Sequence, residues 1–404
     1  MKKILFILAI YFFVHHSATA QFFPVNYTYP MEVHGIHFIN DLVGFAAGLH
    51  EVYKTTDGGS TWTQISSNVF INGPIGVWFM SELTGFIIGS DGGGNPQVGK
   101  TINGGVSWTT TTLPVGGMGF NDANKIFFFD NNTGYIVCRG GHIYKTSDQG
   151  GTWNELASGT SSDLGSVHFP SSSTGYASLS YSNSILKTTD AGTSWTLINT
   201  GQTLSVFDLY FTSADTGFLS CSGSKILKTT DGGSNWSLFS LGTNDDLYAI
   251  EFTAKNVGYA AGQSGTIIAT TSEGLSWFPI ASGITQLIYC MDFPSQQIGY
   301  MGALGPPGKI IKTTNGGGIL SVADLQENSD FSLFPNPTSY FFSITVKSDL
   351  IGSTYNIINQ LGGIVQSGKL TTETTKVDIN QLAAGVYLIQ LGEQSRQSLK
   401  VMKN

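Results

Sequence analysis

The chain has 404 residues and a formal net charge of −8, and only 11% of its residues are charged. This length exceeds the usual single-domain range and predicts a repeat array or two domains. With only two arginines, Arg139 and Arg396, the chain offers no basic stripe, which excludes nucleic acid as an expected partner. The 51 glycines and abundant Ser and Thr favour short strands and turns over helices.

Residues 1–20 have the pattern of a secretory signal peptide. Two lysines precede an apolar run from Ile4 to Val14, and Ala18-Thr19-Ala20 ends the segment, so cleavage is predicted between Ala20 and Gln21. A retained membrane anchor is the alternative, but the apolar run is shorter than the ~20 residues that a span needs. We therefore expect export, with no transmembrane segment in the mature chain.

Residues 21–320 contain a repeated turn motif and a second repeated anchor. The turn motif KTTDGGSTW starts at Lys54 and recurs at Lys100, Lys145, Lys187 and Lys228, with degenerate copies at Ala269 and Lys312. The second anchor is a Phe followed six positions later by Gly and then Phe or Tyr. Its seven copies are Phe38/Gly44, Phe79/Gly85, Phe128/Gly134, Phe169/Gly175, Phe211/Gly217, Phe252/Gly258 and Phe293/Gly299.

The spacing of the Phe anchors predicts a β-propeller. Five of the six intervals are 41 or 42 residues and one is 49, the length of a four-stranded blade. The first unit divides into four short strands, Ile36–Phe38, Gly44–Ala47, Val52–Thr55 and Trp62–Ile65, separated by turns. We therefore predict an all-β chain whose first domain is a seven-bladed propeller.

The turn motif has a structural explanation that needs no ligand. The Asp or Asn accepts backbone N–H groups two or three residues on, the Gly takes a positive φ, and the Trp fills space between blades. The residues assigned these roles are Asp57, Gly59, Trp62, Asn103, Gly105, Trp108, Asp148, Gly150, Trp153, Asp190, Gly192, Trp195, Asp231, Gly233, Trp236, Gly274, Trp277, Asn315 and Gly317.

The pattern Thr55-x-Asp57-x-Gly59-x-Thr61-Trp62 resembles the Asp-box, or bacterial neuraminidase repeat. The longer unit, with its Gly-Phe/Tyr element, is similar to the photosystem II assembly factor type of propeller. The resemblance implies the fold, but such repeats occur in sialidases, glucanases, receptors and assembly factors alike, so it does not decide the function.

The seventh blade lacks its own last strand. Leu320 stands where the Trp is expected, and a polar linker, residues 321–330, follows directly. The unassigned β-rich segment Phe22–Tyr29 is therefore predicted to complete blade seven from the N-terminus.

Residues 331–404 form a second domain, predicted to be a small β-sandwich. LFPNP at Leu333, the stretch Tyr355–Gly368 and INQLAAGVYLIQL at Ile379 resemble the type A C-terminal sorting domain of Bacteroidetes type IX secretion. A β-sandwich that only packs is the alternative. The resemblance implies transit to the outer surface, with the secretion machinery as partner, although Asn356–Gly363 departs from the family pattern.

One variable position on each blade is a candidate binding residue. The residue before each Phe anchor alternates with an apolar one on the first strand, so it is free to face the axial channel or its mouth. These residues are His37, Trp78, Phe127, His168, Tyr210, Glu251 and Asp292. Packing between blades is the alternative. If the residues face the mouth, they would bind a sugar or a peptide.

Two functions remain open: a secreted, non-catalytic binding or adhesion propeller for an extracellular protein or glycan, and a carbohydrate-active hydrolase with two carboxylates. A sialidase needs three arginines for its substrate carboxylate, which this chain lacks. For hydrolysis the candidate carboxylates are Asp208, Asp245, Asp246, Glu251 and Asp292, and no spacing singles out a pair.

No metal, cofactor or disulfide is expected. The histidines show no metal-binding spacing, and the insertion Asp91–Asn95 reads as a solvated loop, with calcium binding as the alternative. Cys138 and Cys221 stand at equivalent places in blades three and five, and Cys290 is the third cysteine; all three are predicted to be small buried residues.

Overall fold

The computed structural model describes residues 22–25, 32–48, 50–67, 69–70, 75–114, 122–305, 308–318, 331–334, 338, 340–358, 364–383, 385–391 and 398–403. The expected signal peptide with its cleavage site and the linker at 321–330 lie outside these ranges. The chain separates into two compact units, Met1–Ile319 and Leu320–Asn404. No helix in the described part is long and apolar enough to cross a membrane.

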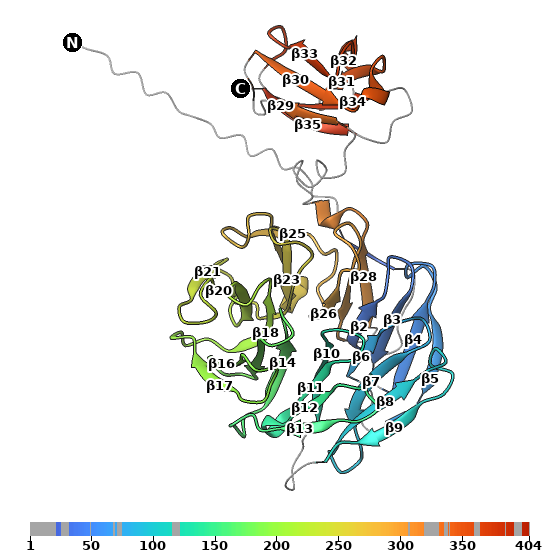
Figure 1. Ribbon diagram of the computed structural model, residues 1–404, viewed down its shortest axis with the longest axis vertical. Helices are drawn as coiled ribbons and strands as arrows, with labels where there is room; N and C mark the ends of the chain where they lie inside the picture. Colours follow the sequence, from blue (N-terminus) through green and yellow to red (C-terminus); the bar gives the residue numbers. More distant parts are fainter. Residues whose placement is uncertain are drawn as a thin grey trace, which may run out of the picture. The chain divides into compact units, whose positions relative to one another are not determined.

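The first unit is a seven-bladed β-propeller of four-stranded antiparallel sheets (Figure 1). Blade one contains β2 (Val33–Phe38), β3 (Gly44–Gly48), β4 (Glu51–Thr55) and β5 (Thr63–Ser67). Blade two contains β6 (Gly76–Phe79), β7 (Gly85–Ser90), β8 (Pro96–Thr101) and β9 (Thr109–Thr112). Blade three contains β10 (Ala123–Phe128), β11 (Gly134–Cys138), β12 (Ile143–Thr146) and β13 (Asn154–Leu156). Blade four contains β14 (Leu164–His168), β15 (Gly175–Leu179), β16 (Ser184–Thr188) and β17 (Thr196–Asn199). Blade five contains β18 (Val206–Phe211), β19 (Gly217–Cys221), β20 (Lys225–Thr229) and β21 (Ser237–Ser240).

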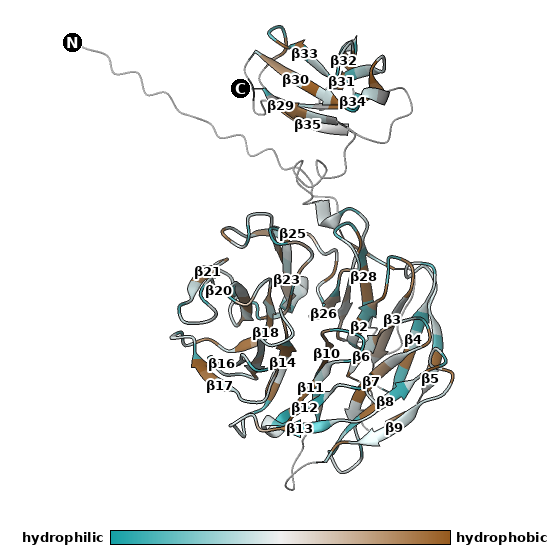
Figure 2. Cartoon of the chain, viewed as in Figure 1, coloured by the Kyte–Doolittle hydropathy of each residue, from teal (hydrophilic) through white to brown (hydrophobic). Residues whose placement is uncertain are grey.

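Blade six contains β22 (Leu247–Phe252), β23 (Gly258–Gly262), β24 (Ile267–Thr270) and β25 (Phe278–Ile280). Blade seven contains β26 (Ile288–Asp292), β27 (Gly299–Ala303), β28 (Lys309–Thr313) and the N-terminal β1 (Phe23–Pro24). Helical structure in the described propeller is limited to the single 3₁₀ turns η1 (Arg139–Gly141), η2 (Gln263–Gly265) and η3 (Gly316–Gly318). The first strand of each blade lies nearest the axis (Figure 1), and in blade two the inner β7 is apolar while the outer β9 is not (Figure 2).

The two residues of the Phe–Gly anchor fit each other. In every blade a Cβ added to the Gly would overlap the ring of the Phe six residues earlier, so only Gly leaves room for that ring. Each Phe ring also contacts the aromatic that follows the anchor Gly of the preceding blade. The stacked pairs are Phe45–Phe79, Phe86–Phe128, Tyr135–Phe169, Tyr176–Phe211, Phe218–Phe252, Tyr259–Phe293 and, across the ring closure, Phe38–Tyr300.

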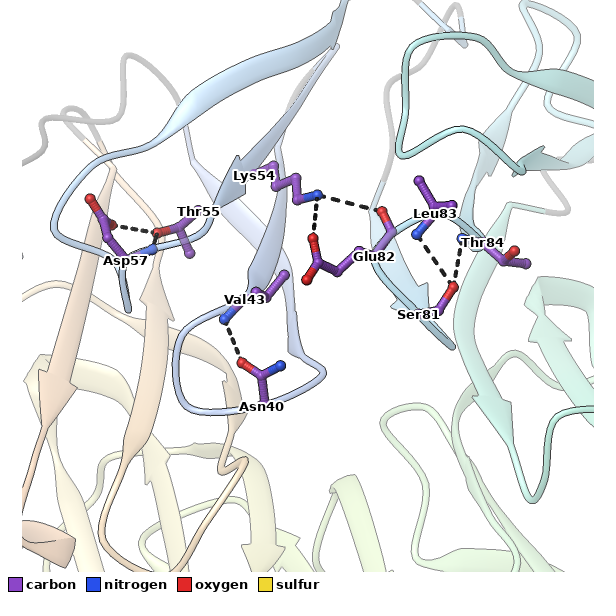
Figure 3. A network of polar contacts seen from close by, with 9 residues as sticks. All are labelled: Asn40, Val43, Lys54, Thr55, Asp57, Ser81, Glu82, Leu83 and Thr84. Atoms are coloured by element: carbon purple, nitrogen blue, oxygen red, sulfur yellow. Dashed lines mark hydrogen bonds and ion pairs between the residues drawn. The ribbon is translucent and has the colours of Figure 1, made fainter.

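The turn motif is held by a Thr and an Asp together. In blade one the hydroxyl of Thr55 donates to Asp57 Oδ1 (Figure 3) and accepts the N–H of Gly59. Asp57 Oδ1 also accepts the N–H of Thr61 at 2.8 Å. The N–H that Asp57 accepts thus lies four residues on, whereas Asn315 of blade seven accepts the N–H of Gly318, three residues on as the sequence predicts. Gly59 has the expected positive φ of 83°.

In six of the seven blades the Lys that begins the turn motif donates to the next blade, and blade six has Ala269 there. In blade four the ammonium of Lys187 lies over the Tyr176 ring and donates to the carbonyl of Gly232 in the next blade at 2.9 Å. Lys312 closes the ring in the same way by donating to Gly58 at 2.7 Å. Lys54 instead reaches the side chain and carbonyl of Glu82 at 3.5 Å (Figure 3).

The N-terminal segment supplies both a strand and an aromatic ring to blade seven. β1 pairs antiparallel with β28, with Phe23 opposite Lys312, just as Thr63 lies opposite Lys54 in blade one. Phe22 therefore takes the place that Trp62 has in blade one. It is fully buried and lies edge-on to the anchor ring of Phe293, at 6.5 Å.

The insertion loop and the cysteines have local roles. Both carboxylate oxygens of Asp91 accept bonds from the loop itself, from Gly93 N, Asn95 N and Asn95 Nδ2, which leaves little capacity for an ion. Cys138, Cys221 and Cys290 are buried and free, as predicted.

The second unit is a small all-β domain with its own core. Its sheets are β29 (Phe331–Phe334), β30 (Phe341–Val346) and β33 (Thr374–Asp378), and β32 (Ile364–Lys369), β31 (Thr354–Ile358), β34 (Gly385–Leu391) and β35 (Ser398–Lys403), with one 3₁₀ turn, η4 (Ser348–Leu350). Residues of both sheets, among them Phe342, Ile357 and Ile389, share one hydrophobic cluster.

Candidate binding site on the propeller axis

The first strands of all seven blades surround a cavity of about 390 Å³ on the propeller axis. This volume falls in the range of small-molecule sites. Side chains line the cavity in three layers, which we call the inner ring, the charged layer and the mouth. The residues of these layers stand one, three and four positions before the Phe anchors on the same strands, and Tyr181, from the turn between β15 and β16, adds to the mouth.

The inner ring consists of the seven residues singled out from the sequence: His37, Trp78, Phe127, His168, Tyr210, Glu251 and Asp292. All seven line the cavity. Five of them form an unbroken series of ring contacts, His37–Trp78 at 4.4 Å, Trp78–Phe127 at 5.6 Å, Phe127–His168 at 5.0 Å and His168–Tyr210 at 4.5 Å. This side of the cavity is therefore lined by aromatic side chains that contact one another.

Three members of the inner ring also bind the next blade. His37 Nδ1 accepts the N–H of Phe79 at 3.3 Å, Glu251 Oε1 accepts that of Phe293 at 3.2 Å, and Asp292 Oδ2 accepts that of Phe38 at 2.8 Å. Each acceptor belongs to one blade and each donor to the anchor of the following blade. These side chains thus have a structural role at the axis besides any contact with a ligand.

The charged layer contains one cation, Lys125, and the carboxylate of Asp208 at the same position of another blade. Lys125 extends from blade three toward the axis, and Asp208 is the main cause of its raised pKa, with smaller contributions from Cys290 and Glu251. The side chain is surrounded by protein but open to the space of the cavity. Among the described residues its ammonium makes no hydrogen bond or ion pair.

The carboxyl groups of blades five to seven differ in how they are satisfied. Asp208 uses both oxygens, accepting the N–H of Leu209 at 2.9 Å and that of Ile250 at 3.2 Å. Burial raises the pKa of Glu251 well above its usual range, and the neighbouring Asp292 raises it further. Burial likewise raises the pKa of Asp292 to about 7.

The two histidines of the inner ring are neutral at physiological pH. Burial lowers the pKa of His37 to about 4. Burial and the nearby Lys125 lower the pKa of His168 to about 3. The aromatic side of the inner ring therefore carries no charge, and the ionisable groups lie on the side of blades five to seven.

The mouth is an arc of aromatic rings that the sequence analysis missed. Tyr181 contacts Phe207 at 5.7 Å, Phe207 contacts Tyr248 at 4.4 Å, and Tyr248 contacts Tyr289 at 5.9 Å. His34 extends the arc from Tyr289 at 5.7 Å. Tyr181 is 74% exposed and Tyr289 39% exposed, so their rings are open to solvent.

A β-bulge explains why these aromatics were missed. Strict alternation sends the residues one and three before the Phe anchor to the axis. The register shifts between Val206 and Asp208, between Leu247 and Ala249 and between Ile288 and Cys290, so the intervening residue, four before the anchor, also lines the cavity. The signal was present in the repeats, because three successive blades have Phe or Tyr at this position.

Charged residues of loops lie at the rim. Arg139 lines the cavity and its guanidinium lies 3.6 Å from Asp122 and 3.9 Å from Asp163. The other two carboxylates that the sequence suggested for hydrolysis form hydrogen bonds between loops. Asp245 accepts hydrogen bonds from Ser264 and Thr266, and Asp246 accepts the N–H of Gly223. Within the described ranges no group of three or more His, Cys, Asp or Glu side chains is arranged to hold a metal ion.

Two family models match parts of the chain. The secretion system C-terminal sorting domain matches residues 332–404, and the photosynthesis system II assembly factor YCF48 matches residues 187–283. The first match indicates export of the chain to the cell surface or the extracellular space. The second agrees with the predicted type of propeller repeat.

One curated relative shares only a short region. β-Agarase A of Zobellia galactanivorans is 34% identical over 76 residues, which are 19% of this chain and 14% of the agarase. The chain thus corresponds to a small part of that protein, and the match does not carry its activity over.

Solved structures show the same fold in proteins of different function. YCF48 bound to a D1 peptide has a TM-score of 0.60 at 21% identity, over 73% of this chain and 94% of its own. The GH74 xyloglucanase of Xanthomonas campestris has a TM-score of 0.58 at 13% identity, over 95% and 68%. PorZ, a surface component of the type IX secretion system of Porphyromonas gingivalis, has a TM-score of 0.55 at 14% identity, over 95% and 61%. Enzymes and non-enzymes both occur among them.

Proposed function

We propose that this exported propeller is a non-catalytic binding protein that takes up the end of an extracellular ligand in its axial cavity, through the aromatic mouth. The observation that carries the proposal is the contrast between the two aromatic layers. The inner ring is occupied by contacts within the propeller, whereas Tyr181 and Tyr289 present open rings at the rim of a cavity of ligand size. Aromatic rings with a polar edge suit a surface that must stay wet until a ligand covers it.

The exposure of Tyr181 supports this proposal. Tyr181 has a φ of 55° in the left-handed region, which is uncommon for a bulky residue. The equivalent turn position is also left-handed at His50, Gly223 and Ser264, so this conformation belongs to the turn. What distinguishes blade four is the large aromatic ring at this position, which is 74% exposed.

The test is a binding screen on an array of glycans and peptides, followed by substitution of the mouth. Tyr248→Ala combined with Tyr289→Ala should weaken any binding found by about tenfold or more, because each ring contributes stacking area. Phe278→Ala is the matched control, since Phe278 is an aromatic of similar exposure, 37%, on an outer strand. Retention of full affinity in the double variant would refute the proposed site.

Hydrolysis of a carbohydrate is the second candidate. It is favoured by the neighbouring Glu251 and Asp292, whose raised pKa values suit a general acid. Against it, each of these carboxyl groups already accepts a backbone N–H of the next blade. Turnover of a polysaccharide that is lost in Glu251→Gln and Asp292→Asn, while binding remains, would decide for the enzyme.

A further inference from the structure

The charged layer limits the kind of ligand that the cavity accepts. It holds one ammonium, that of Lys125, and the carboxyl groups of Asp208 and, from the adjoining inner ring, of Glu251 and Asp292 line the same cavity from three successive blades. Each carboxylate oxygen of Asp208 already accepts a backbone N–H group. Among the described residues that line the cavity, the Lys125 ammonium, Glu251 Oε2 and Asp292 Oδ1 make no hydrogen bond and can bind a ligand, and Ser166 Oγ and His168 Nδ1 have no partner either.

We infer that the cavity takes a neutral ligand rich in hydroxyl groups, a carbohydrate, whose end unit lies between the Lys125 ammonium and the carboxyl groups of Glu251 and Asp292. This inference rests on the proposed binding function and names its ligand class. A hydroxyl group both accepts and donates, so one sugar unit can accept from Lys125 and donate to a carboxyl oxygen. The mouth aromatics then cover the apolar face of the next unit.

Charged ligands fit the same layer less well. A ligand carboxylate that paired with Lys125 would also face the carboxylate of Asp208 in a partly desolvated space, where like charges repel strongly, and the raised pKa values of Glu251 and Asp292 show that a further negative charge is disfavoured there. A ligand ammonium that paired with Glu251 would meet the Lys125 ammonium at the axis. A neutral ligand avoids both costs, because it leaves the existing balance of one cation and its acidic neighbours unchanged.

The sizes agree with this assignment. The cavity of about 390 Å³ lies at the lower end of the range for small-molecule sites, which suits the end of a chain and not a whole polymer. Side chains of the inner ring contact one another along the opposite part of the lining, from His37 through Trp78 and Phe127 to His168 and Tyr210, which narrows that end. A polysaccharide would therefore enter by its terminus.

The experiment measures affinity by calorimetry for three sets of oligosaccharides of matched length. One set is neutral, with glucose, xylose, mannose and galactose units, one consists of galacturonic acid units and one of glucosamine units. We expect millimolar or tighter binding within the neutral set and at least tenfold weaker binding of the charged sets. Lys125→Met should weaken neutral binding by about tenfold or more, because a hydrogen bond to a charged donor is lost.

Two further variants make the result decisive. Lys255→Met is the control, because Lys255 is 76% exposed and paired with Glu273 on an outer loop. Glu251→Gln keeps an acceptor for Phe293 N and tests the carboxyl side should Lys125→Met fail to fold, and we expect it to weaken neutral binding as well.

The outcomes separate this inference from the proposed function. Tighter binding of either charged set, or unchanged affinity in Lys125→Met and Glu251→Gln, overturns the inference while the proposed site stands if the mouth variant still loses binding. Binding of peptides but of no saccharide overturns the inference and keeps the proposed function. Binding of a neutral saccharide that the mouth variant does not weaken overturns both.

Discussion

At the scale of single residues, Tyr181 combines exposure with an unfavourable backbone. A non-glycine residue in the left-handed region costs roughly 1–2 kcal/mol relative to its preferred conformations. Its ring is mostly exposed and contacts only Phe207 edge-on among the described residues, so little packing offsets this cost. Substitution of Tyr181 should therefore affect ligand binding without lowering stability, which cannot be expected for the buried residues of the cavity.

We expect Tyr181→Gly to leave the propeller as stable as before, or up to about 1 kcal/mol more stable, while weakening ligand binding. Relief of the left-handed strain is partly offset by the larger entropy that glycine has in the unfolded chain. Thermal melting and the binding assay measure the two effects. Gln149→Gly, with a φ of 59° in the turn of blade three and away from the cavity, should change stability similarly and binding not at all. A marked loss of stability in Tyr181→Gly would contradict the argument.

Asp292 predicts a pH dependence whose sign follows from its raised pKa. Folding raises the pKa of this carboxyl group from its ordinary value of roughly 4 to about 7, so between these values the folded chain keeps a proton that the unfolded chain releases. The stability that this group contributes is thus present at low pH and is lost as the pH rises toward 7. Asn at this position keeps an oxygen for the Phe38 N–H but never ionises.

Asp292→Asn should therefore match the wild type near pH 4 and exceed it by about 1 kcal/mol or more near pH 8. The lowered pKa values of His37 and His168 act in the opposite direction, because the unfolded chain gains protons below roughly pH 6.5, but they are common to both proteins and cancel in the difference. Denaturant unfolding across this pH range gives the comparison. A variant that is less stable than the wild type near pH 8 would show that Asp292 is stabilised as an anion.

At the scale of elements, blade seven is completed by the shortest strand of the propeller. β1 has two residues, and Val25 adds one backbone bond to Ile310 at 3.0 Å. The buried ring of Phe22 packs where the other blades have the Trp of the turn motif, because it lies edge-on to the anchor Phe293 and against Gly317. Apolar burial therefore contributes more to this closure than strand pairing does.

Phe22→Ala should destabilise the propeller by about 3 kcal/mol, which is typical of a buried Phe truncated in a core. Phe23→Ala is the matched control, because the adjacent Phe23 is 44% exposed and should cost less than about 0.5 kcal/mol. Phe22→Trp should largely keep the stability, since the other blades hold Trp there. Equal effects of the two alanine variants, measured by denaturant unfolding, would show that the pairing and not the ring closes the blade.

The sequence predicted the blades better than the cavity. Phe and Gly anchors repeat because each pair must fit the same aromatic contact, so their spacing gave the blade count, and alternation placed the seven inner-ring residues at the axis. The mouth could not be obtained from alternation, because the bulge before Asp208, Ala249 and Cys290 brings a second residue to the axis. Nor does the sequence indicate that Lys125 approaches Asp208, Glu251 and Asp292, since these residues lie on different blades.

At the scale of the whole molecule, the chain joins two units that each have a core. The propeller contacts repeat from blade to blade and close on themselves through Phe38–Tyr300 and Lys312–Gly58, without residues of the tail. The tail has its own hydrophobic cluster, and its match to a sorting domain indicates a role in export. Stability of the propeller and delivery to the surface should therefore depend on different parts of the chain.

Deletion of residues 320–404 should leave the melting temperature of the propeller and its ligand affinity unchanged, while the protein is no longer exported to the surface. The reason is that a closed ring of blades needs no further strand, whereas the sorting domain matched to residues 332–404 lies wholly in the deleted part. Calorimetry of both purified proteins tests the first expectation, and fractionation of cells expressing them tests the second. A lowered melting temperature would mean that the tail stabilises the propeller, and normal export of the truncated chain would mean that another segment carries the signal. If both expectations hold, the binding site and the sorting domain can be altered independently, because no residue that lines the axial cavity belongs to the tail.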